Sequence, residues 1–235
     1  MNNILSMALG AAMLFVACSD KKENLIEEKG IDACLMAKNY KYEELLTKSD
    51  IAKHVTIDEG SYKADVSPTR GEYGSCSYEW HSNRPDIPME LLGQVISVPD
   101  KNRVTLKMLG FYTDGELKRY SQASAIDLFD QTYKKLSQQE YQELLENLAK
   151  EYANDTPGYE QAKRFLDARM EFTFEPVANL GNRAYGAWDE EHGITLVVLA
   201  GAAYFTIESK TTGEATTSLE HAVHFAKEVL AKCGG

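Results

Sequence analysis

The stretch that decides the fold is residues 183–209, "RAYGAWDEEHGITLVVLAGAAYFTIES", which holds three apolar runs separated by two short breaks. The runs 183–188, 194–200 and 203–209 are rich in β-branched and aromatic residues, and "DEEHG" and "GA" have the composition of turns. Connections this short join antiparallel strands, because a parallel pair needs a crossover of a dozen or more residues. The stretch therefore predicts an antiparallel sheet rather than a parallel Rossmann sheet.

Further strands are predicted on the N-terminal side of this stretch. "EFTFEPV" (171–177) precedes it closely, and "PDKN" (99–102) has turn chemistry between two earlier strands. The earlier strands are predicted at 61–66, 74–82, 94–98 and 103–111. Strands from both ends of the chain would then share one sheet.

Helices are predicted before, between and after these strands. "YKYEELLTKSDIAKHV" (40–55) predicts a helix with a break near Ser49, whose hydroxyl could cap a following turn. A helical insertion is predicted at about 121–171, where Ser137 and Glu140 form a capping box. A third helix of the insertion follows Thr156, with Pro157 at its first position.

The last predicted helix opens with Thr217 and Glu220 as a capping box. Its apolar residues share one face, namely Leu219, Ala222, Val223, Ala226, Leu230 and Cys233. His221, His224 and Glu228 fall on the opposite face, toward solvent. The predicted fold class is α+β, with an antiparallel sheet flanked by helices and a helical insertion in the middle of the chain.

The N-terminus has the pattern of an export signal. Residues 4–17 are apolar or small and precede Cys18, after which the chain turns to charge. Phe15 to Ala17 resemble a bacterial lipobox, which implies that residues 1–17 are a lipoprotein signal peptide and that Cys18 carries the lipid. Residues 18–30 would form a flexible polar tether, and 31–235 a single domain.

The tether also indicates a location. Ser19 is not the aspartate that retains lipoproteins in some inner membranes, and the charged tether resembles export signals of surface lipoproteins in Bacteroidetes. We therefore expect an outer-membrane protein, held by its lipid anchor and facing the periplasm or the cell surface.

The composition limits the classes of partner that we expect. The formal charge of -11 has no Lys/Arg cluster to interrupt it, so nucleic acid and anionic headgroups are poor partners for this surface. The apolar content of 43% is enough for a folded core.

Three cysteines remain after Cys18, so one disulfide and one free thiol are expected in an oxidising compartment. The favoured pairing is Cys34 with Cys76, which closes a loop of about 40 residues and would stabilise by roughly 3 to 4 kcal/mol. Cys34 with Cys233 is the alternative. No pair has the short spacing that structural zinc sites use.

Three clusters are candidates for chemistry. His221 and His224 with Glu228 have a spacing that could hold a metal, but we interpret them as a solvent face and expect no metal and no cofactor. "WDEEHG" (188–193) could bind calcium weakly, but a charged hairpin turn is the favoured interpretation. Trp80 and His81 could line a pocket, yet the alternation of Cys76, Tyr78 and Trp80 indicates core packing.

Local catalytic motifs are absent from the sequence. It has no GxSxG, HExxH, Gly-rich phosphate loop or CxxC. A pair of carboxylates brought together from distant segments is still compatible with the sequence, because such pairs are defined in space.

Three blocks carry a resemblance to known proteins. They are "LLTKSDIAKHV" (45–55), "GEYGSCSYEW" (71–80) and "VANLGNRAYGAWDEEHGITLVVLAGAAYFTI" (177–207). Together they resemble a diffuse group of bacterial lipoproteins of unknown function with a PsbP-like α+β fold, and the resemblance implies no catalytic residue. The chain departs from that group at Cys34, which lies some ten residues before Leu45, and at Asn182, where Asp is usual.

The sequence thus favours a lipid-anchored cell-envelope protein that acts as a non-enzymatic binding or structural module. Its expected partner is an envelope protein or glycan. The alternative is an envelope hydrolase whose carboxylate or histidine chemistry is assembled from distant segments.

Overall fold

The computed structural model of the chain describes residues 30–38, 40–69, 71–171 and 174–234. They divide into two compact units, one within residues 24–134 and 173–235 and the other containing 135–172. The range 31–235, predicted as a single domain, therefore holds both. The predicted signal peptide, Cys18 and the tether up to residue 29 lie outside the described residues.

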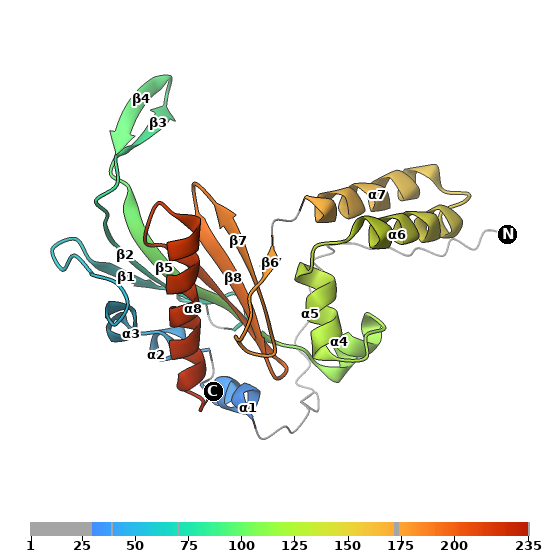
Figure 1. Cartoon of the computed structure of the whole chain (residues 1–235), viewed down its shortest axis with the longest axis horizontal. Coiled ribbons are helices and arrows are strands. Elements are labelled where there is room, and N and C mark those ends of the chain that lie inside the picture. The colour runs from blue at the N-terminus through green and yellow to red at the C-terminus, as the bar shows by residue number, and fades with distance from the viewer. Residues whose placement is uncertain (1–29, 39, 70, 172–173, 235) are drawn as a thin grey trace. The chain divides into compact units, whose positions relative to one another are not determined.

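The larger unit is built on a seven-stranded sheet in which all neighbouring strands are antiparallel, as predicted. In spatial order the strands are β1 (Lys63–Val66), β2 (Ser75–His81), β5 (Lys101–Phe111), β9 (Ala203–Lys210), β8 (Gly193–Ala200), β7 (Arg183–Asp189) and β6 (Glu175–Pro176). Helices pack against this sheet, so the fold class is α+β (Figure 1).

The turn between β7 and β8 shows why this part of the sequence is a hairpin. Asp189 Oδ1 accepts hydrogen bonds from the backbone N–H groups of Glu191 and His192, at 2.9 and 2.7 Å. Gly193 has a φ of +88°, and a Cβ there would lie 2.4 Å from the carbonyl oxygen of Ser209. "WDEEHG" therefore forms a hairpin turn, as predicted, and the Asp189 carboxylate holds that turn.

Both faces of the sheet are covered by apolar side chains. Alternate residues of β8 face opposite sides, so Leu196 and Val198 belong to one core while Val197 and Leu199 belong to another. The first core lies against α8 and the N-terminal helices, and the second includes Phe129 of α5 (Ala125–Tyr133). A short helix that the sequence did not predict, α4 (Asp114–Arg119), precedes α5.

Helix α8 (Ala215–Ala231) lies across the first face, against β8 and β9 (Figure 1). Its predicted apolar face is confirmed, because Ala222, Ala226 and Leu230 are buried in the core. The predicted capping box of Thr217 and Glu220 is wrong. The helix begins at Ala215 after Glu214, whose backbone N–H donates to Thr212 Oγ1, so the chain becomes helical two residues before Thr217.

Two short helices replace the single helix predicted over 40–55, namely α2 (Tyr42–Leu45) and α3 (Lys48–Ala52). A further helix that the sequence did not predict, α1 (Ile31–Ala37), precedes them. The predicted break near Ser49 is confirmed, but the capping residue is Thr47 and not Ser49. Thr47 Oγ1 accepts from the backbone N–H of Asp50, and the Asp50 carboxylate accepts from the backbone N–H of Thr47. This capping box fixes the start of α3.

The predicted disulfide between Cys34 and Cys76 is wrong. Cys34 is joined to Cys233, the alternative pairing, with Cα atoms 5.5 Å apart. Cys76 is a buried free thiol on β2. The physical reason is where the two side chains lie. Alternation along β2 points Cys76 into the core, where its Sγ lies 3.9 Å from the carbonyl oxygen of Leu46. Cys34 lies on α1, beside the end of α8 that carries Cys233.

The smaller unit is a pair of helices, α6 (Gln138–Glu151) and α7 (Thr156–Met170). The predicted capping box of Ser137 and Glu140 is confirmed at the start of α6. Helix α7 starts at Thr156 and is capped by Asp155. The helical region predicted at about 121–171 is thus divided, because α5 packs on the sheet of the larger unit while α6 and α7 pack on each other.

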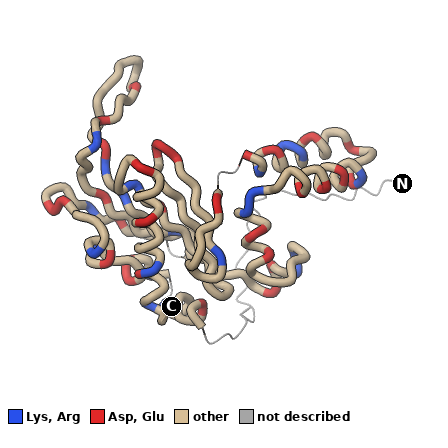
Figure 2. Tube along the Cα trace, viewed as in Figure 1, with Lys and Arg blue, Asp and Glu red and all other residues tan. Residues whose placement is uncertain are grey.

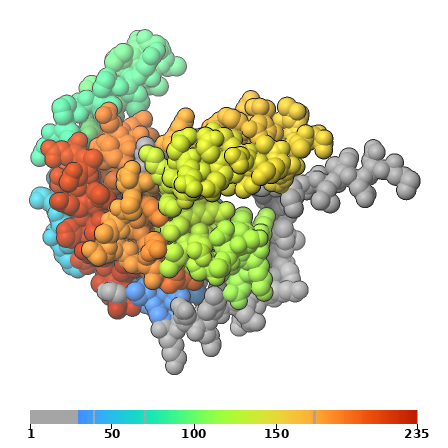
Figure 3. Space-filling view, turned by 45° about the vertical axis from the view of Figure 1, so that its right-hand side comes forward, coloured from blue at the N-terminus to red at the C-terminus, as the bar shows by residue number. Residues whose placement is uncertain are grey.

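Strands β3 (Ile87–Leu91) and β4 (Gln94–Val98) form a separate two-stranded hairpin, which stands clear of the rest of its unit in Figure 3. The sequence predicted β4 but not β3. Leu92 and Gly93 connect the strands with φ values of 52° and 77°, a left-handed pair typical of a two-residue hairpin turn. Between residues 86 and 100 the hairpin carries acidic but no basic side chains (Figure 2).

No helix in the described part of the chain combines the length and the apolar character that crossing a bilayer requires.

Candidate functional site

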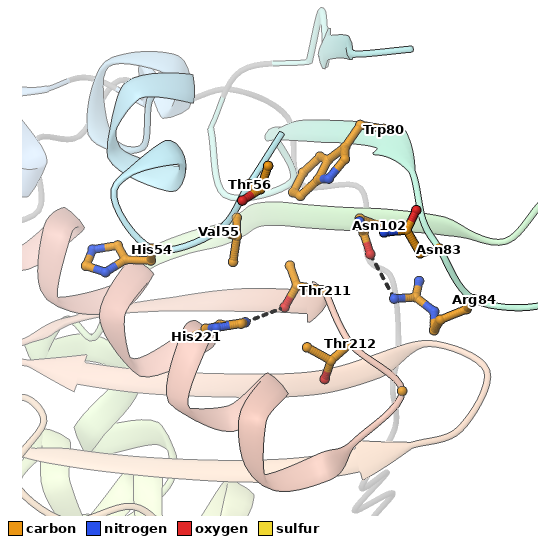
Figure 4. Close-up of a pocket in the computed structure, with 11 residues that line it drawn as sticks. His54, Val55, Thr56, Trp80, Asn83, Arg84, Asn102, Thr211, Thr212 and His221 are labelled. Atoms are coloured by element: carbon orange, nitrogen blue, oxygen red, sulfur yellow. Dashed lines mark hydrogen bonds between the residues drawn. The ribbon is translucent and has the colours of Figure 1, made fainter. Parts of the chain in front are cut away.

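A pocket of about 510 Å³ lies in the larger unit, at the foot of the β3–β4 hairpin (Figure 4). Six parts of the chain line it. The loop after α3 contributes His54, Val55 and Thr56, β2 contributes Trp80, and the segment after β2 contributes Asn83 and Arg84. Asn102 of β5, residues 211–213 after β9, and His221 of α8 complete the lining.

Arg84 organises the pocket wall next to the hairpin. Its Nε donates to Asp100 Oδ2, one Nη donates to Asn102 Oδ1 at 2.8 Å, and the other Nη donates to the carbonyl oxygen of Lys101 at 2.7 Å. The Lys210 ammonium lies 3.2 Å from Asp100 Oδ1. Arg84 thereby clamps together the two chain segments from which the hairpin starts and ends.

Asp100 is buried between these two cations. Burial opposes ionisation of its carboxyl, but the hydrogen bond and charge of Arg84, followed by those of Lys210, hold the pKa of Asp100 below its ordinary value. Two cations share this one carboxylate, so the group of Arg84, Lys210 and Asp100 carries one net positive charge.

Trp80 forms part of the pocket wall and leaves a polar atom without a partner. The predicted core packing of Cys76, Tyr78 and Trp80 is confirmed, since all three are buried. Trp80 is only 2% exposed, yet its indole Nε1 has no hydrogen-bond partner among the described residues. Figure 4 shows the indole ring directed into the space between Thr56 and Asn102. His81, the neighbour that the sequence also singled out, is exposed at the end of β2.

His221 lies on the α8 side of the pocket. Its Nδ1 is 2.8 Å from Thr211 Oγ1, a hydrogen bond drawn in Figure 4. Burial lowers the pKa of His221, and the neighbouring His224 and His54 lower it further, while Glu220 opposes them. The prediction that His221 faces solvent is therefore wrong, because this side chain is half-buried against Thr211.

The residues weighed as metal ligands have separate partners. His224 is exposed and stacks on His54, with ring centroids 4.6 Å apart. Glu228 Oε1 lies 3.0 Å from His54 Nε2, and its Oε2 lies 2.6 Å from the Lys53 ammonium. No group of three His, Cys, Asp or Glu side chains that could hold a metal ion occurs in the ranges that the structure describes.

The hairpin above the pocket exposes an apolar face. Ile87 pairs with Val98, Met89 with Ile96 and Leu91 with Gln94, so these side chains project from the same side. On this side Met89 is 49% and Leu91 53% exposed, and Leu92 in the turn is 97% exposed. The hairpin therefore exposes a group of neighbouring apolar side chains, which soluble proteins usually bury or cover with a partner.

Sequence reasoning missed most of this site. Arg84, Asn102 and Thr211 belong to segments far apart in the sequence, and no local motif connects them. The hairpin did leave a signal, since Leu92 and Gly93 separate two short apolar runs. Pro88 in the first run argues against a central strand, although an edge strand such as β3 tolerates it.

No protein-family model matches the chain, nor does any curated protein or solved structure. The resemblance to lipoproteins with a PsbP-like fold stays a prediction.

Proposed function

We propose that this chain is a lipid-anchored outer-membrane protein that acts as a non-enzymatic binding module and docks on an envelope protein through the β3–β4 hairpin. The observation that carries the proposal is the unpartnered apolar face of this hairpin. The anchor at Cys18 is the part of the proposal that derives from the sequence pattern.

The energetics of the hairpin favour a binding role. A two-stranded hairpin is marginally stable in water unless its apolar face packs on another surface. Within the described residues, β3 and β4 form a sheet only with each other, and Met89, Leu91 and Ile96 on one side of it are exposed. A partner that covers these side chains would supply the packing that the hairpin lacks.

Charge and composition favour a protein partner over a bilayer. Segments that insert at a membrane surface usually carry Lys or Arg and aromatic anchors, whereas residues 86–100 contain neither and include Asp86 and Glu90. The hairpin also projects from the end of its unit opposite α1, the first helix after the predicted tether (Figure 1). The partner that fits is a protein with an apolar groove edged by basic residues.

The pocket lining favours binding over hydrolysis. Of the described residues that line it, none is Asp or Glu, so the lining offers no carboxylate for general acid or base chemistry. Among the described residues, His221 has Thr211 and no carboxylate as its hydrogen-bond partner. The other lining histidine, His54, is held by Glu228 and stacks on His224.

The experiment places a photo-reactive amino acid at Leu92 in cells and identifies the protein that cross-links. The same substitution at Tyr73, which is 80% exposed in the same unit but outside the hairpin, is the control. The partner is then purified and its affinity measured for the wild type, for the double variant Met89→Ser and Leu91→Ser, and for Tyr73→Ser. We expect the hairpin variant to bind at least about tenfold more weakly and Tyr73→Ser to bind normally.

Two results would overturn the proposal. Cross-links from Leu92 to a second copy of this chain, with a concentration-dependent dimer that the hairpin variant abolishes, would assign the face to self-association. Binding of the purified protein to phospholipid vesicles, abolished by the same variant, would assign the face to a bilayer. The anchor is tested separately, because Cys18→Ser should move the protein from the membrane fraction to the periplasmic fraction.

A further inference from the structure

We propose that the pocket at the foot of the hairpin binds the carboxylate of a small organic acid. The inference rests on the donors in the pocket and not on the docking of the hairpin, so it stands apart from the function proposed above. Three observations carry it, namely an unused buried donor, a set of fixed donors and the charge of the lining.

The unused donor is the indole N–H of Trp80. A buried N–H that has lost water and gained no acceptor is unfavourable, and such groups are rare in folded proteins. The Trp80 ring is directed into the pocket (Figure 4), and its Nε1 has no partner among the described residues. An acceptor oxygen that enters the pocket would satisfy this donor.

Further donors are held in place around the same space. Arg84 directs three of its N–H groups to Asp100, Asn102 and Lys101, which fixes the plane of the guanidinium and leaves two of its five N–H groups for a ligand. Asn102 Oδ1 accepts from Arg84, and the amide nitrogen of Asn102 donates one N–H to the carbonyl oxygen of His81 at 3.3 Å, which leaves one N–H for a ligand. A planar guanidinium held in this way suits a planar, two-oxygen acceptor such as a carboxylate.

The charge of the lining favours an anion, and the volume of the pocket indicates the size of that anion. The chain has a formal charge of -11, yet Arg84 is the only Lys, Arg, Asp or Glu among the described residues that line the pocket. Arg84 and Lys210 share the single carboxylate of Asp100, so one positive charge is left to balance a ligand. A monoanionic carboxylate matches that charge better than a dianionic phosphate. The volume of about 510 Å³ accommodates a small organic acid.

The test uses nuclear magnetic resonance of the full chain without its signal peptide. The chain has two tryptophans, Trp80 and Trp188, and Trp80→Phe assigns their indole N–H signals. Benzoate at millimolar concentration should move the Trp80 signal in a saturable way and leave Trp188 unchanged. Benzamide, which keeps the shape but lacks the charge, should move neither signal.

A variant that adds one negative charge tests the site without disturbing the core. Asn83 is an exposed residue of the pocket rim, and Asn83→Asp should weaken benzoate binding at least about tenfold. Asn147→Asp makes the same charge change on the exposed surface of α6 and should bind benzoate normally. Unchanged affinity in Asn83→Asp would overturn the proposal.

Other probes decide what kind of ligand the pocket selects. A short peptide with a free C-terminal carboxylate is compared with the same peptide amidated at its C-terminus, and binding of only the free form would show that the carboxylate can belong to a peptide. Inorganic phosphate that binds more tightly than benzoate would overturn the choice of a carboxylate. A Trp80 signal that no acid moves, or that benzamide moves equally, would overturn the site.

Discussion

Cys34 and Cys233 lie 199 residues apart in the sequence, and their disulfide ties α1 to the segment that follows α8. The bond therefore links the first described helix of the larger unit to the residues directly after its last helix. It also leaves Cys76 as a buried thiol, whose pKa is raised to about 11 by burial.

Removal of this disulfide should lower stability strongly. In the chain-entropy model, a loop of this length stabilises the folded state by about 5 kcal/mol, because the cross-link restricts the unfolded chain. We expect the double variant Cys34→Ser and Cys233→Ser to lose a large part of that free energy of unfolding, measured with urea. The matched control is Cys76→Ala, which keeps the disulfide and should lose much less free energy of unfolding in urea without reductant. Peptide mapping that linked Cys76 to either partner would contradict the assignment.

Asp50 should make stability depend on pH at the acid end. Burial opposes its ionisation, but hydrogen bonds from Thr47, Lys232 and Lys53 outweigh this and hold the pKa of Asp50 well below its ordinary value. Because the folded state depresses this pKa, the contribution of Asp50 is present above the unfolded value near 3.8 and is lost as pH falls toward the folded value.

The variant Asp50→Asn should therefore cost about 2 kcal/mol at neutral pH, through the lost cap and the lost ion pairs. The difference from wild type should shrink as the unfolding midpoint is measured at progressively lower pH. The control is Asp58→Asn, in an exposed turn, which should change the midpoint little. A pH-independent difference would show that packing, and not the charge, is responsible.

His221 should oppose folding when it is protonated. Its pKa is lowered from the ordinary value of 6.5, so the unfolded state binds more protons than the folded state around that pH. The free energy of unfolding should therefore fall as pH drops from 7 through 6.5, and His221→Gln should remove part of this slope. The His221 ring signals in a nuclear magnetic resonance titration give the direct measurement. A titration midpoint above 6.5 would contradict the burial of this ring.

Asp100 should hold the base of the hairpin. Its replacement by Asn leaves Arg84 and Lys210 without their shared carboxylate in a largely buried setting, so we expect a loss of about 2 to 3 kcal/mol. Hydrogen exchange of the β3 and β4 amides should also become faster. Asp86→Asn is the control, because this exposed residue directly before β3 accepts, among the described residues, a hydrogen bond from Ser97 Oγ alone. Slow exchange that survived in Asp100→Asn would show that the clamp does not govern the hairpin.

The sheet could be predicted from the sequence because its signals are local. Turns as short as Gly201 and Ala202 permit only antiparallel pairing, and alternation along β2 places Cys76, Tyr78 and Trp80 on one face. Helix ends were less certain, since Thr47 and Ser49 are both plausible caps and only the position of Asp50 decides between them.

The disulfide and the pocket depend on contacts between residues that are distant in the sequence, which no local sequence pattern encodes. Loop length favoured Cys76 as the partner of Cys34, but the tertiary fold brings Cys34 to Cys233. The pocket likewise joins Arg84 to Asn102 through the base of a hairpin of which only one strand was predicted. Long-range packing decides both features.

The bond between Cys34 and Cys233 has one more consequence, for proteolysis. Almost the entire folded body is a covalent ring, so one cut anywhere inside it opens the ring without dividing the protein. Both fragments stay connected to the residues before Cys34, and hence to any lipid at Cys18. Release of the folded protein from its membrane would require a cut between Cys18 and Cys34. A cut between Cys34 and Cys233 would release a fragment only if a reductant also broke the disulfide.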